Sequence, residues 1–326
     1  MGIILDLIPT NLDSEKAKFY ADAHYNPQFT YVREFTDEEM NKYDHPKKEY
    51  FEHAQKMLEL YGLPLLSGEV ESFPPDTPPY ATQQEVENYL RDLVGKLGLP
   101  DLPVRFSEEF GSQMMLVGGS LHIRLPIKFT TNNLRHKLNH EIQTHYLRRY
   151  NQDLQEWNLE SEKKDPQAFR TTEEGLANLH SFVERPDPVM RKTYLNYFAA
   201  YFGHHASFRQ LYNELIAVGV NERLAWNLTL KQKRGLKDTS LPGGWSKNHI
   251  YFEGTVKVWR WLADSTNDPR ALYYGRITLE DVPRVLELPL SQDIIFPTFY
   301  QDLNSYRQLI DAIGEINKLS ALPVFT

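Results

Sequence analysis

The chain of 326 residues contains no cysteine. This absence excludes a disulfide scaffold, a cysteine nucleophile and a thiolate zinc site, and it is compatible with a cytoplasmic protein. No stretch approaches the roughly 18 consecutive apolar residues that cross a bilayer, so the sequence predicts no membrane contact. The first residues lack the basic start and the long apolar core of a secretory signal, and we expect none.

Basic residues are not in excess, because the formal net charge is -8. Proteins that bind nucleic acid generally carry a basic domain, so we expect no nucleic-acid partner. Two local clusters nevertheless stand out: Arg124, Lys128, Arg135, Lys137, Arg148 and Arg149 face one acid, Glu141, and Lys231, Lys233, Arg234 and Lys237 follow later. These clusters favour an acidic or carboxylate-bearing substrate.

Fixed-period repeats and low-complexity tails are also absent. With 41% hydrophobic and 13% aromatic residues, the chain can bury a sizeable core as one large domain or two smaller ones. The proline-rich segment 72–79 predicts a linker. We therefore expect an N-terminal helical and loop segment, residues 1–79, that packs on a catalytic domain formed by residues 80–326.

Local patterns predict an α+β fold that is mostly helical. Capping boxes at Thr36 and Thr82 open two helices, and apolar spacing predicts three more over 189–202, 205–218 and 221–231. The segment 104–106 is a short strand, and 114–125 is a hairpin around Gly118-Gly119. A small sheet directly before a metal-binding helix is the arrangement of zincin-like metallopeptidases.

Two histidines flank a glutamate in the segment His140-Glu141-Ile142-Gln143-Thr144-His145. In the H-E-x-x-H motif of zinc peptidases the histidines are one residue closer and share a helical face. At about 100° per residue, a five-residue step turns the side chain by about 140°, so an undistorted helix separates the pair. We expect a single-turn π-bulge to bring both to one ion. The alternative pair, His136 and His140, encloses no carboxylate and ranks lower.

A catalytic zinc site needs a third protein ligand and an open position. The best candidates are Glu173 and Glu174, about thirty residues downstream of the histidine pair. Thr171 followed three residues later by Glu174 also matches a capping box at a helix start. In an isolated segment the cap would be the simpler interpretation. Beside a histidine pair, either carboxylate could be the third ligand.

The metal segment resembles the microtubule-associated tyrosine carboxypeptidase family, whose bacterial relatives are named for a Q-E-G-L-A motif. The resemblance continues through three later segments: Glu173-Glu174-Gly175-Leu176-Ala177, Arg234-Gly235-Leu236 and residues 247–254. It implies one Zn²⁺ per chain, held by His140, His145 and Glu174, with Glu141 as the catalytic base. It also implies removal of a C-terminal tyrosine from an acidic tail such as that of α-tubulin, in the cytoplasm and at microtubules.

A carboxypeptidase must hold the terminal carboxylate of its substrate with a fixed cation. Arg234 is the first candidate because its guanidinium binds a carboxylate in bidentate fashion, and Lys247 is the second. Tyr251 or His249 is a candidate donor to the developing oxyanion.

Two further functions stay open. Asn248 follows Lys247 where the family pattern has an aspartate, and Lys231 stands where it has an arginine. Neither position carries a metal ligand, so both bear on substrate choice, and a zinc peptidase of the bacterial branch with another substrate is the first alternative. A regulatory protein with a structural zinc is the second. Glu141 argues against it, because a structural site has no use for a base and closes with four protein ligands.

Overall fold

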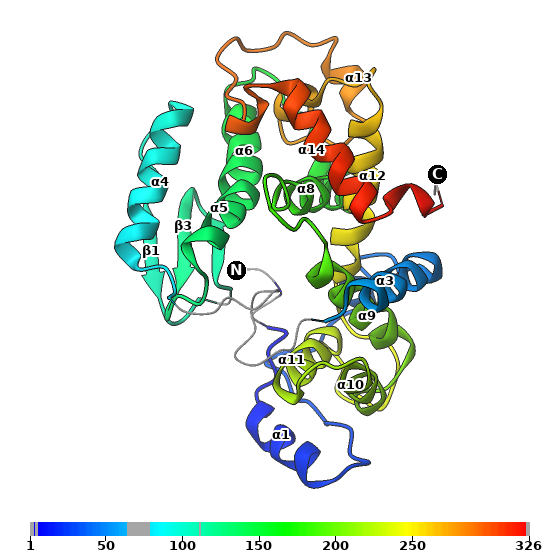
Figure 1. The fold of residues 1–326 in the computed structure, drawn as a ribbon. Helices are drawn as coiled ribbons and strands as arrows, with labels where there is room; N and C mark the ends of the chain where they lie inside the picture. Colours follow the sequence, from blue (N-terminus) through cyan, green and yellow to red (C-terminus); the bar gives the residue numbers. More distant parts are fainter. Residues whose placement is uncertain (1–2, 4–5, 64–78, 111, 324–326) are drawn as a thin grey trace. The chain divides into compact units, whose positions relative to one another are not determined.

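The computed structural model describes residue 3 and residues 6–63, 79–110 and 112–323, and the chain divides into two compact units (Figure 1). The first unit combines Met1–Val70 with Arg191–His249, and the second combines Glu71–Met190 with Ile250–Thr326. The linker predicted over 72–79 lies almost entirely outside the described residues. The expected domain boundary after residue 79 therefore stays a prediction.

The first unit is helical, and its helices confirm most of the local predictions. Its elements are α1 (Leu12–Ala21), α2 (Asp37–Met40), α3 (Lys48–Tyr61), α9 (Arg191–His205), α10 (Phe208–Ala217) and α11 (Glu222–Gln232). The capping box of Thr36 is present at α2. Helix α3 packs along α9, where the rings of Phe51 and Tyr201 stack 4.3 Å apart. Aromatic side chains thus form much of this core, as the composition suggested.

The second unit contains a small sheet and the remaining helices. Its elements are α4 (Gln83–Leu97), β1 (Val104–Ser107), β2 (Met114–Val117), β3 (Ser120–Arg124), α5 (Thr131–His140), η1 (Glu141–Tyr146), α6 (Leu147–Asp153), α7 (Ser161–Lys164), α8 (Pro166–His180), most of α12 (Asn248–Ala263), η2 (Pro269–Tyr273), α13 (Val282–Val285), η3 (Thr298–Tyr300), α14 (Leu303–Ile316) and η4 (Leu319–Ala321).

The sheet has the order β1-β3-β2, with β2 and β3 antiparallel and β1 parallel to β3. The hairpin turns at Gly118 and Gly119, whose φ angles of 56° and 78° favour glycine. Leu121 and Ile123 of the central strand are fully buried. The predicted hairpin and the mostly helical α+β class are confirmed, and β2 is an outer strand beside η1.

Helix α8 begins earlier than its sequence suggested. Pro166 occupies its first turn, and the side chain of Asp165 caps it by accepting a hydrogen bond from the Ala168 amide at 2.9 Å. Thr171 therefore lies inside the helix, where its hydroxyl donates to the Gln167 carbonyl. The capping box proposed for Thr171 and Glu174 is wrong, because the cap that starts the helix lies six residues upstream.

Helices α8 and α12 touch through their main chains at two glycines. A Cβ atom on Gly175 would lie 2.2 Å from the carbonyl carbon of Gly254, and one on Gly254 would lie 2.1 Å from the Thr171 oxygen. Only glycine permits such an approach, so this contact fixes α8 against α12 immediately beside Glu174.

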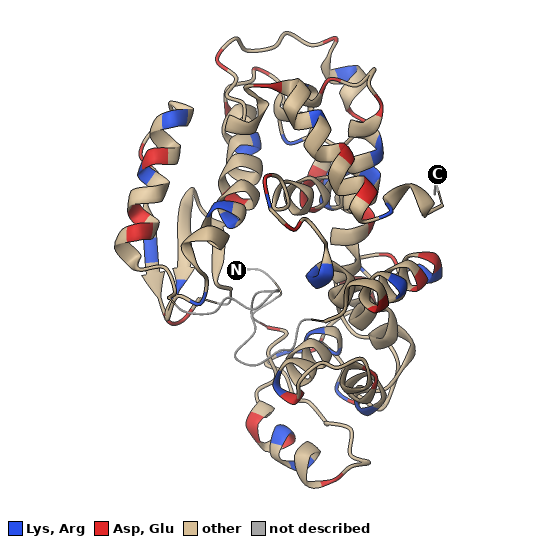
Figure 2. Ribbon diagram, in the orientation of Figure 1, with Lys and Arg blue, Asp and Glu red and all other residues tan. Residues whose placement is uncertain are grey.

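Three residues of the basic clusters make contacts within the protein. Arg148 is fully buried in an ion pair with Glu173, Arg135 pairs with Glu184, and the fully buried Lys233 donates to main-chain carbonyls. Figure 2 shows basic and acidic residues interspersed along helices such as α4. Arg148 and Lys233 therefore do not contribute to a basic surface, which weakens the argument from two clusters to an acidic partner.

None of the helices among residues 6–63, 79–110 and 112–323 combines the length and the apolar composition needed to cross a membrane.

Candidate metal centre

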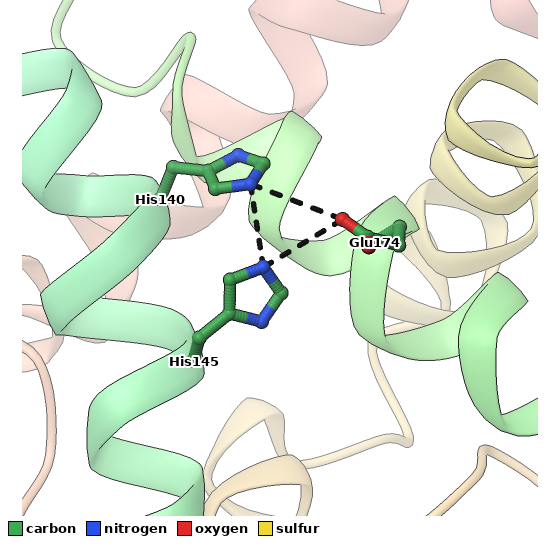
Figure 3. Close-up of side chains that lie close together, drawn as sticks. All are labelled: His140, His145 and Glu174. Carbon is green, nitrogen blue, oxygen red and sulfur yellow. Dashed lines mark hydrogen bonds and ion pairs between the residues drawn. The ribbon is translucent and has the colours of Figure 1, made fainter. Parts of the chain in front are cut away.

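Three of the side chains singled out in the sequence converge in the second unit (Figure 3). His140 ends α5, His145 lies on η1, and Glu174 lies in the middle of α8. The Nε2 atoms of the two histidines are 3.3 Å apart, and Oε2 of Glu174 lies 3.9 Å from the first and 3.7 Å from the second. These atoms form a group that could hold a metal ion.

A π-helical turn brings the histidines together, as the five-residue spacing predicted. Residues Glu141–Tyr146 form this turn between two α-helical segments. Widening a helix displaces main-chain carbonyls from their usual partners. Here the Thr144 hydroxyl donates to the Asn139 carbonyl at 2.8 Å, and the Tyr273 hydroxyl donates to the Gln143 carbonyl at 2.6 Å. The predicted distortion is confirmed, and buried hydroxyls stabilise it.

The separations among the three ligand atoms suit a tetrahedral zinc ion. Zinc bonds of about 2.0–2.1 Å at tetrahedral angles place neighbouring ligand atoms about 3.3 Å apart. The histidine pair matches this separation, and Glu174 is a few tenths of an ångström further away. The side chains of His140 and His145 are 21% and 18% exposed, so solvent reaches part of this group.

Hydrogen bonds at the outer ring nitrogens fix the orientation of both imidazoles. Nδ1 of His145 lies 2.9 Å from Oε1 of Glu173, and His140 is hydrogen bonded to the main chain of Ala177. With these outer contacts in place, the Nε2 atoms of both rings face Oε2 of Glu174. A metal ion at this point would be bound by the inner nitrogens while the outer contacts orient the rings.

Glu173 is itself held by a buried arginine. The Arg148 guanidinium donates to Oε2 of Glu173 at 2.5 Å, and to the carbonyls of Leu272 and Ile277 at 2.9 and 2.5 Å. Arg148 is fully buried and Glu173 is 3% exposed. The pair is therefore satisfied without water, and it links His145 rigidly to the segment that contains η2.

The buried charges shift the pKa values of this cluster in opposite directions. Burial and the neighbouring His145 lower the pKa of His140 to about 3. Burial also disfavours the charged form of His145, but the carboxylates of Glu173 and Glu174 outweigh it and raise that pKa to about 10. Burial likewise opposes ionisation of Glu173, yet Arg148 and His145 lower its pKa to about 2. The carboxylates of Glu173 and Glu174 therefore favour a positive charge at His145.

Glu141 is the first residue of the π-helical turn, and its side chain faces the sheet. Its Oε2 atom accepts a hydrogen bond from the Leu116 amide of the outer strand β2 at 3.2 Å. Burial raises the pKa of this carboxyl. A carboxylate that is poorly solvated and held by one main-chain donor is well suited to accept a proton.

The remaining predicted site residues fall in both units. Tyr251 lies in the first turn of α12, in the unit of the metal ligands, whereas Arg234 and Lys247 belong to the first unit. Their roles in substrate binding stay predictions. His136 is not part of the metal group, and neither is His204.

Sequence reasoning treated Glu173 only as an alternative ligand and missed its partner Arg148. The spacing could have indicated this ion pair, because Arg148 follows His145 by three residues and so lies on the same helical face. A basic residue there needs an acidic partner if it is buried, and Glu173 supplies it.

Comparison with known proteins gives consistent matches over most of the chain. A family model described as microtubule-associated tyrosine carboxypeptidase matches residues 30–318. Microtubule-associated tyrosine carboxypeptidase 1 of Mus musculus is 31% identical over 97% of this chain and 69% of its own length. The human protein of that name is also 31% identical, over 97% of this chain and 68% of its own length. A putative tyrosine carboxypeptidase, MATCAP2 of Mus musculus, is 29% identical over 98% of this chain and 62% of its own length.

Proposed function

The chain belongs to the microtubule-associated tyrosine carboxypeptidase family, and from this membership and the metal centre we propose that it is a zinc carboxypeptidase. Its proposed substrate is an acidic protein tail that ends in tyrosine, such as that of α-tubulin. The observation that supports the chemistry most directly is the convergence of His140, His145 and Glu174 beside the carboxylate of Glu141. Action at microtubules in the cytoplasm is part of the same proposal.

The ligand set fits zinc in donor type and separation, and one ion per chain is proposed. When bound, Zn²⁺ would polarise the scissile carbonyl and lower the pKa of water. Glu141 takes a proton from the attacking water and passes it to the leaving amine. Its hydrogen bond with Leu116 holds the carboxylate in place during both transfers. Glu173 keeps the His145 ring in the orientation that presents Nε2 to the ion.

The outer strand β2 offers a way to hold the substrate. Only β3 pairs with it among the described strands, and Val117 at its end is 42% exposed. An extended peptide could add to the sheet there through main-chain hydrogen bonds. Because β2 also carries the amide that binds Glu141, such a peptide would lie close to the base.

Arg234 is the proposed anchor for the terminal carboxylate. Its guanidinium is largely removed from water, which lowers its pKa, and only Tyr31 acts on it in the opposite direction. No carboxylate among the described residues pairs with it. A cation in such a setting gains strongly from a bidentate anionic ligand. Lys247 is the second candidate, and Tyr251 is the proposed donor to the oxyanion.

The decisive experiment follows peptide mass during incubation with the purified protein, after its zinc content has been measured. The substrate is an acidic tubulin-tail peptide ending in tyrosine, and the controls are the C-terminally amidated peptide and the Glu141→Gln variant. Loss of one tyrosine by the parent from the free-acid peptide alone supports the proposal. Cleavage of the amidated peptide at the same rate would contradict a carboxypeptidase. No cleavage by a zinc-loaded protein would favour another peptide substrate or the non-catalytic role.

A further inference from the structure

Helix α8 contacts the metal-binding helix at a second place, beyond its two glutamates. His180, the last residue of α8, is fully buried in the second unit. Its Nδ1 atom lies 2.9 Å from the hydroxyl oxygen of Thr144 and 3.4 Å from the hydroxyl oxygen of Tyr273. These are the two hydroxyls that stabilise the π-helical turn, so His180 is linked to that turn without belonging to the ligand group.

The hydrogen bonds of this cluster determine where its hydrogens lie. The Thr144 hydroxyl is 2.8 Å from the Asn139 carbonyl. The Tyr273 hydroxyl is 2.6 Å from the Gln143 carbonyl. A carbonyl oxygen only accepts, so each hydroxyl gives its single hydrogen to the main chain. The contacts of both hydroxyl oxygens with His180 therefore place a hydrogen on Nδ1, which donates to them.

The other ring nitrogen of His180 also has a partner. Its Nε2 atom lies 3.0 Å from the hydroxyl of Tyr306 on α14. Burial lowers the pKa of His180 to about 3, so the ring is neutral at pH 7. A neutral ring with its hydrogen on Nδ1 accepts at Nε2, and Tyr306 is the donor. Tyr306 thus favours the tautomer of His180 that donates to the two hydroxyls.

The segment that carries Tyr273 holds the metal-binding helix at further points. The Leu272 carbonyl accepts a hydrogen bond from Arg148 at 2.9 Å, and the Tyr273 carbonyl accepts one from the Asn151 side chain at 2.8 Å. The ring of Tyr273 is fully buried and lies at 19° to the ring of His180. These contacts do not involve the Tyr273 hydroxyl, so its removal alone should leave the ring in place.

The main-chain groups held in this way lie directly beside the candidate ligands. Asn139 precedes His140, and Gln143 and Thr144 precede His145. A π-helical turn shifts carbonyls away from their α-helical positions, and the two hydroxyls supply donors at the shifted positions. They therefore favour the π form over an α-helical turn of the same residues. An α-helical turn would separate the two histidines by about 140° around the helix axis.

We propose that His180 is a positioning residue of the metal centre. Acting through the hydroxyls of Thr144 and Tyr273, it holds the π-helical turn in the form that brings the Nε2 atoms of the two ligand histidines to 3.3 Å from each other. This role rests on the proposed function only in so far as the centre binds zinc, and it needs neither peptide cleavage nor a known substrate. The effect on the metal is indirect, through the conformation of the main chain.

Zinc binding by variants that lack one hydroxyl tests this role. Tyr273→Phe removes only the hydroxyl, and Thr144→Val replaces the other hydroxyl with a methyl group. Each should weaken zinc binding about tenfold in competition with a fluorescent chelator, the lower end of the usual effect of removing a group that orients a metal ligand.

Tyr197→Phe is the matched control. Tyr197 is also fully buried, and its hydroxyl accepts a hydrogen bond from the Lys47 amide at 2.7 Å in the first unit. This variant loses a buried hydrogen bond of the same kind, at a place that does not contact the π-helical turn. It should lose stability and bind zinc as tightly as the parent.

Two substitutions test His180 itself. His180→Asn keeps an N–H group near the position of Nδ1, whereas His180→Leu has no donor. Zinc binding should weaken about tenfold in His180→Leu and by less in His180→Asn. In the Thr144→Val background His180→Leu should weaken zinc binding less than in the parent, because the donor has already lost one of its acceptors.

Thermal denaturation separates positioning from a general loss of stability. A ligand that binds the folded chain raises Tm by an amount that grows with its affinity. At one fixed zinc concentration, the rise in Tm relative to the chelated protein should be smaller in Tyr273→Phe than in the parent. In Tyr197→Phe the rise should equal that of the parent, although both variants start from a lower Tm.

Parental zinc affinity in both Tyr273→Phe and Thr144→Val would overturn the positioning role, whether or not the His180 variants fold. An equal loss of affinity in Tyr197→Phe would overturn it as well. A parent chain that binds no zinc would overturn both this role and the proposed function. If the parent binds zinc and cleaves no peptide, the peptidase alone is contradicted, and weaker zinc binding in the two hydroxyl variants still supports the role of His180.

Discussion

Glu173 and His145 are joined by a 2.9 Å contact between Oε1 and Nδ1, while the adjacent Glu174 faces Nε2 of the same ring at 3.7 Å. Consecutive residues of α8 thus act on opposite nitrogens of one imidazole. One carboxylate orients the ring and the other joins it in the ligand group. This arrangement favours Glu174 over Glu173 as the third candidate ligand, because its Oε2 atom faces both histidines.

Glu173→Gln should weaken zinc binding by about 10- to 100-fold, the usual effect of removing the partner of a metal-bound histidine. It should also lower the free energy of unfolding by about 3 kcal/mol, because the buried Arg148 loses its countercharge. Competition with a fluorescent chelator and urea denaturation measure the two effects. Glu160→Gln, which alters an exposed pair with Lys163, is the control. Parental zinc affinity in Glu173→Gln would show that His145 needs no orienting carboxylate.

Glu141→Gln should retain about one zinc per chain and lose peptidase activity by about 10²- to 10⁴-fold, the range for removal of a general base. The amide keeps an oxygen for the Leu116 hydrogen bond, so the fold should persist. Metal analysis and single-turnover cleavage are measured on the same sample. Glu174→Ala provides the contrast, since it should lose zinc instead. Parental cleavage by Glu141→Gln would remove Glu141 from the mechanism.

Arg234→Ala should raise KM for peptides with a free C-terminus by at least tenfold and change kcat much less, because the carboxylate contact contributes to binding. The loss should shrink when the same peptides are amidated. Thermal denaturation checks that the variant is folded. If KM rises equally for both kinds of peptide, Arg234 does not read the terminal carboxylate, and Lys247→Ala should be measured next.

Gly175→Ala should destabilise the protein by about 1–3 kcal/mol, the range for a forced extra carbon in a packed interior. The added Cβ atom would lie 2.2 Å from the Gly254 carbonyl carbon, so α8 and α12 must move apart. Because Glu174 is adjacent, zinc affinity should fall as well. Gly95→Ala, inside α4 with nothing within 4 Å of the added Cβ atom, is the control for loss of a helical glycine. Unchanged stability in Gly175→Ala would mean that the helices tolerate a wider crossing.

Stability should fall with pH below about 6.5, in part through His180. This fully buried ring contacts Thr144 and Tyr306, and burial lowers its pKa from 6.5 to about 3. Below pH 6.5 the unfolded chain therefore binds the extra proton, so stability is lost as pH falls toward 3. From pH 7 to pH 5 this residue alone should account for about 2 kcal/mol.

Urea denaturation of the parent and of His180→Gln at both pH values measures this contribution. The variant should lose less stability on acidification than the parent, whatever its absolute stability. His24→Gln, at an exposed position, should behave like the parent. An equal pH dependence in His180→Gln and the parent would show that His180 is not the titrating group.

The parts of the fold that sequence patterns predicted are those that depend on neighbouring residues. The capping box at Thr82, the Gly118-Gly119 hairpin and the π turn all follow from residues within about five positions of one another. The error at α8 has a similar origin. Two competing caps lay within ten residues, and the proline beside Asp165 was a stronger start than the threonine at position 171.

Features that depend on distant residues could not be predicted in this way. In the sequence, Arg148 is one of several clustered basic residues. In the structure its guanidinium is buried and donates to the carbonyls of Leu272 and Ile277. Burial decides the role of such side chains, and burial is a property of the folded chain.

The π turn has a consequence for how such sites are recognised. It absorbs its additional residue within a single turn, so His145 meets His140 as it would in an uninterrupted helix one residue shorter. Two histidines separated by five residues across a π turn can therefore place their Nε2 atoms as two histidines separated by four residues do in an α-helix. Counting the positions between two ligands can therefore separate motifs that place their donor atoms alike, because the helix absorbs the inserted residue.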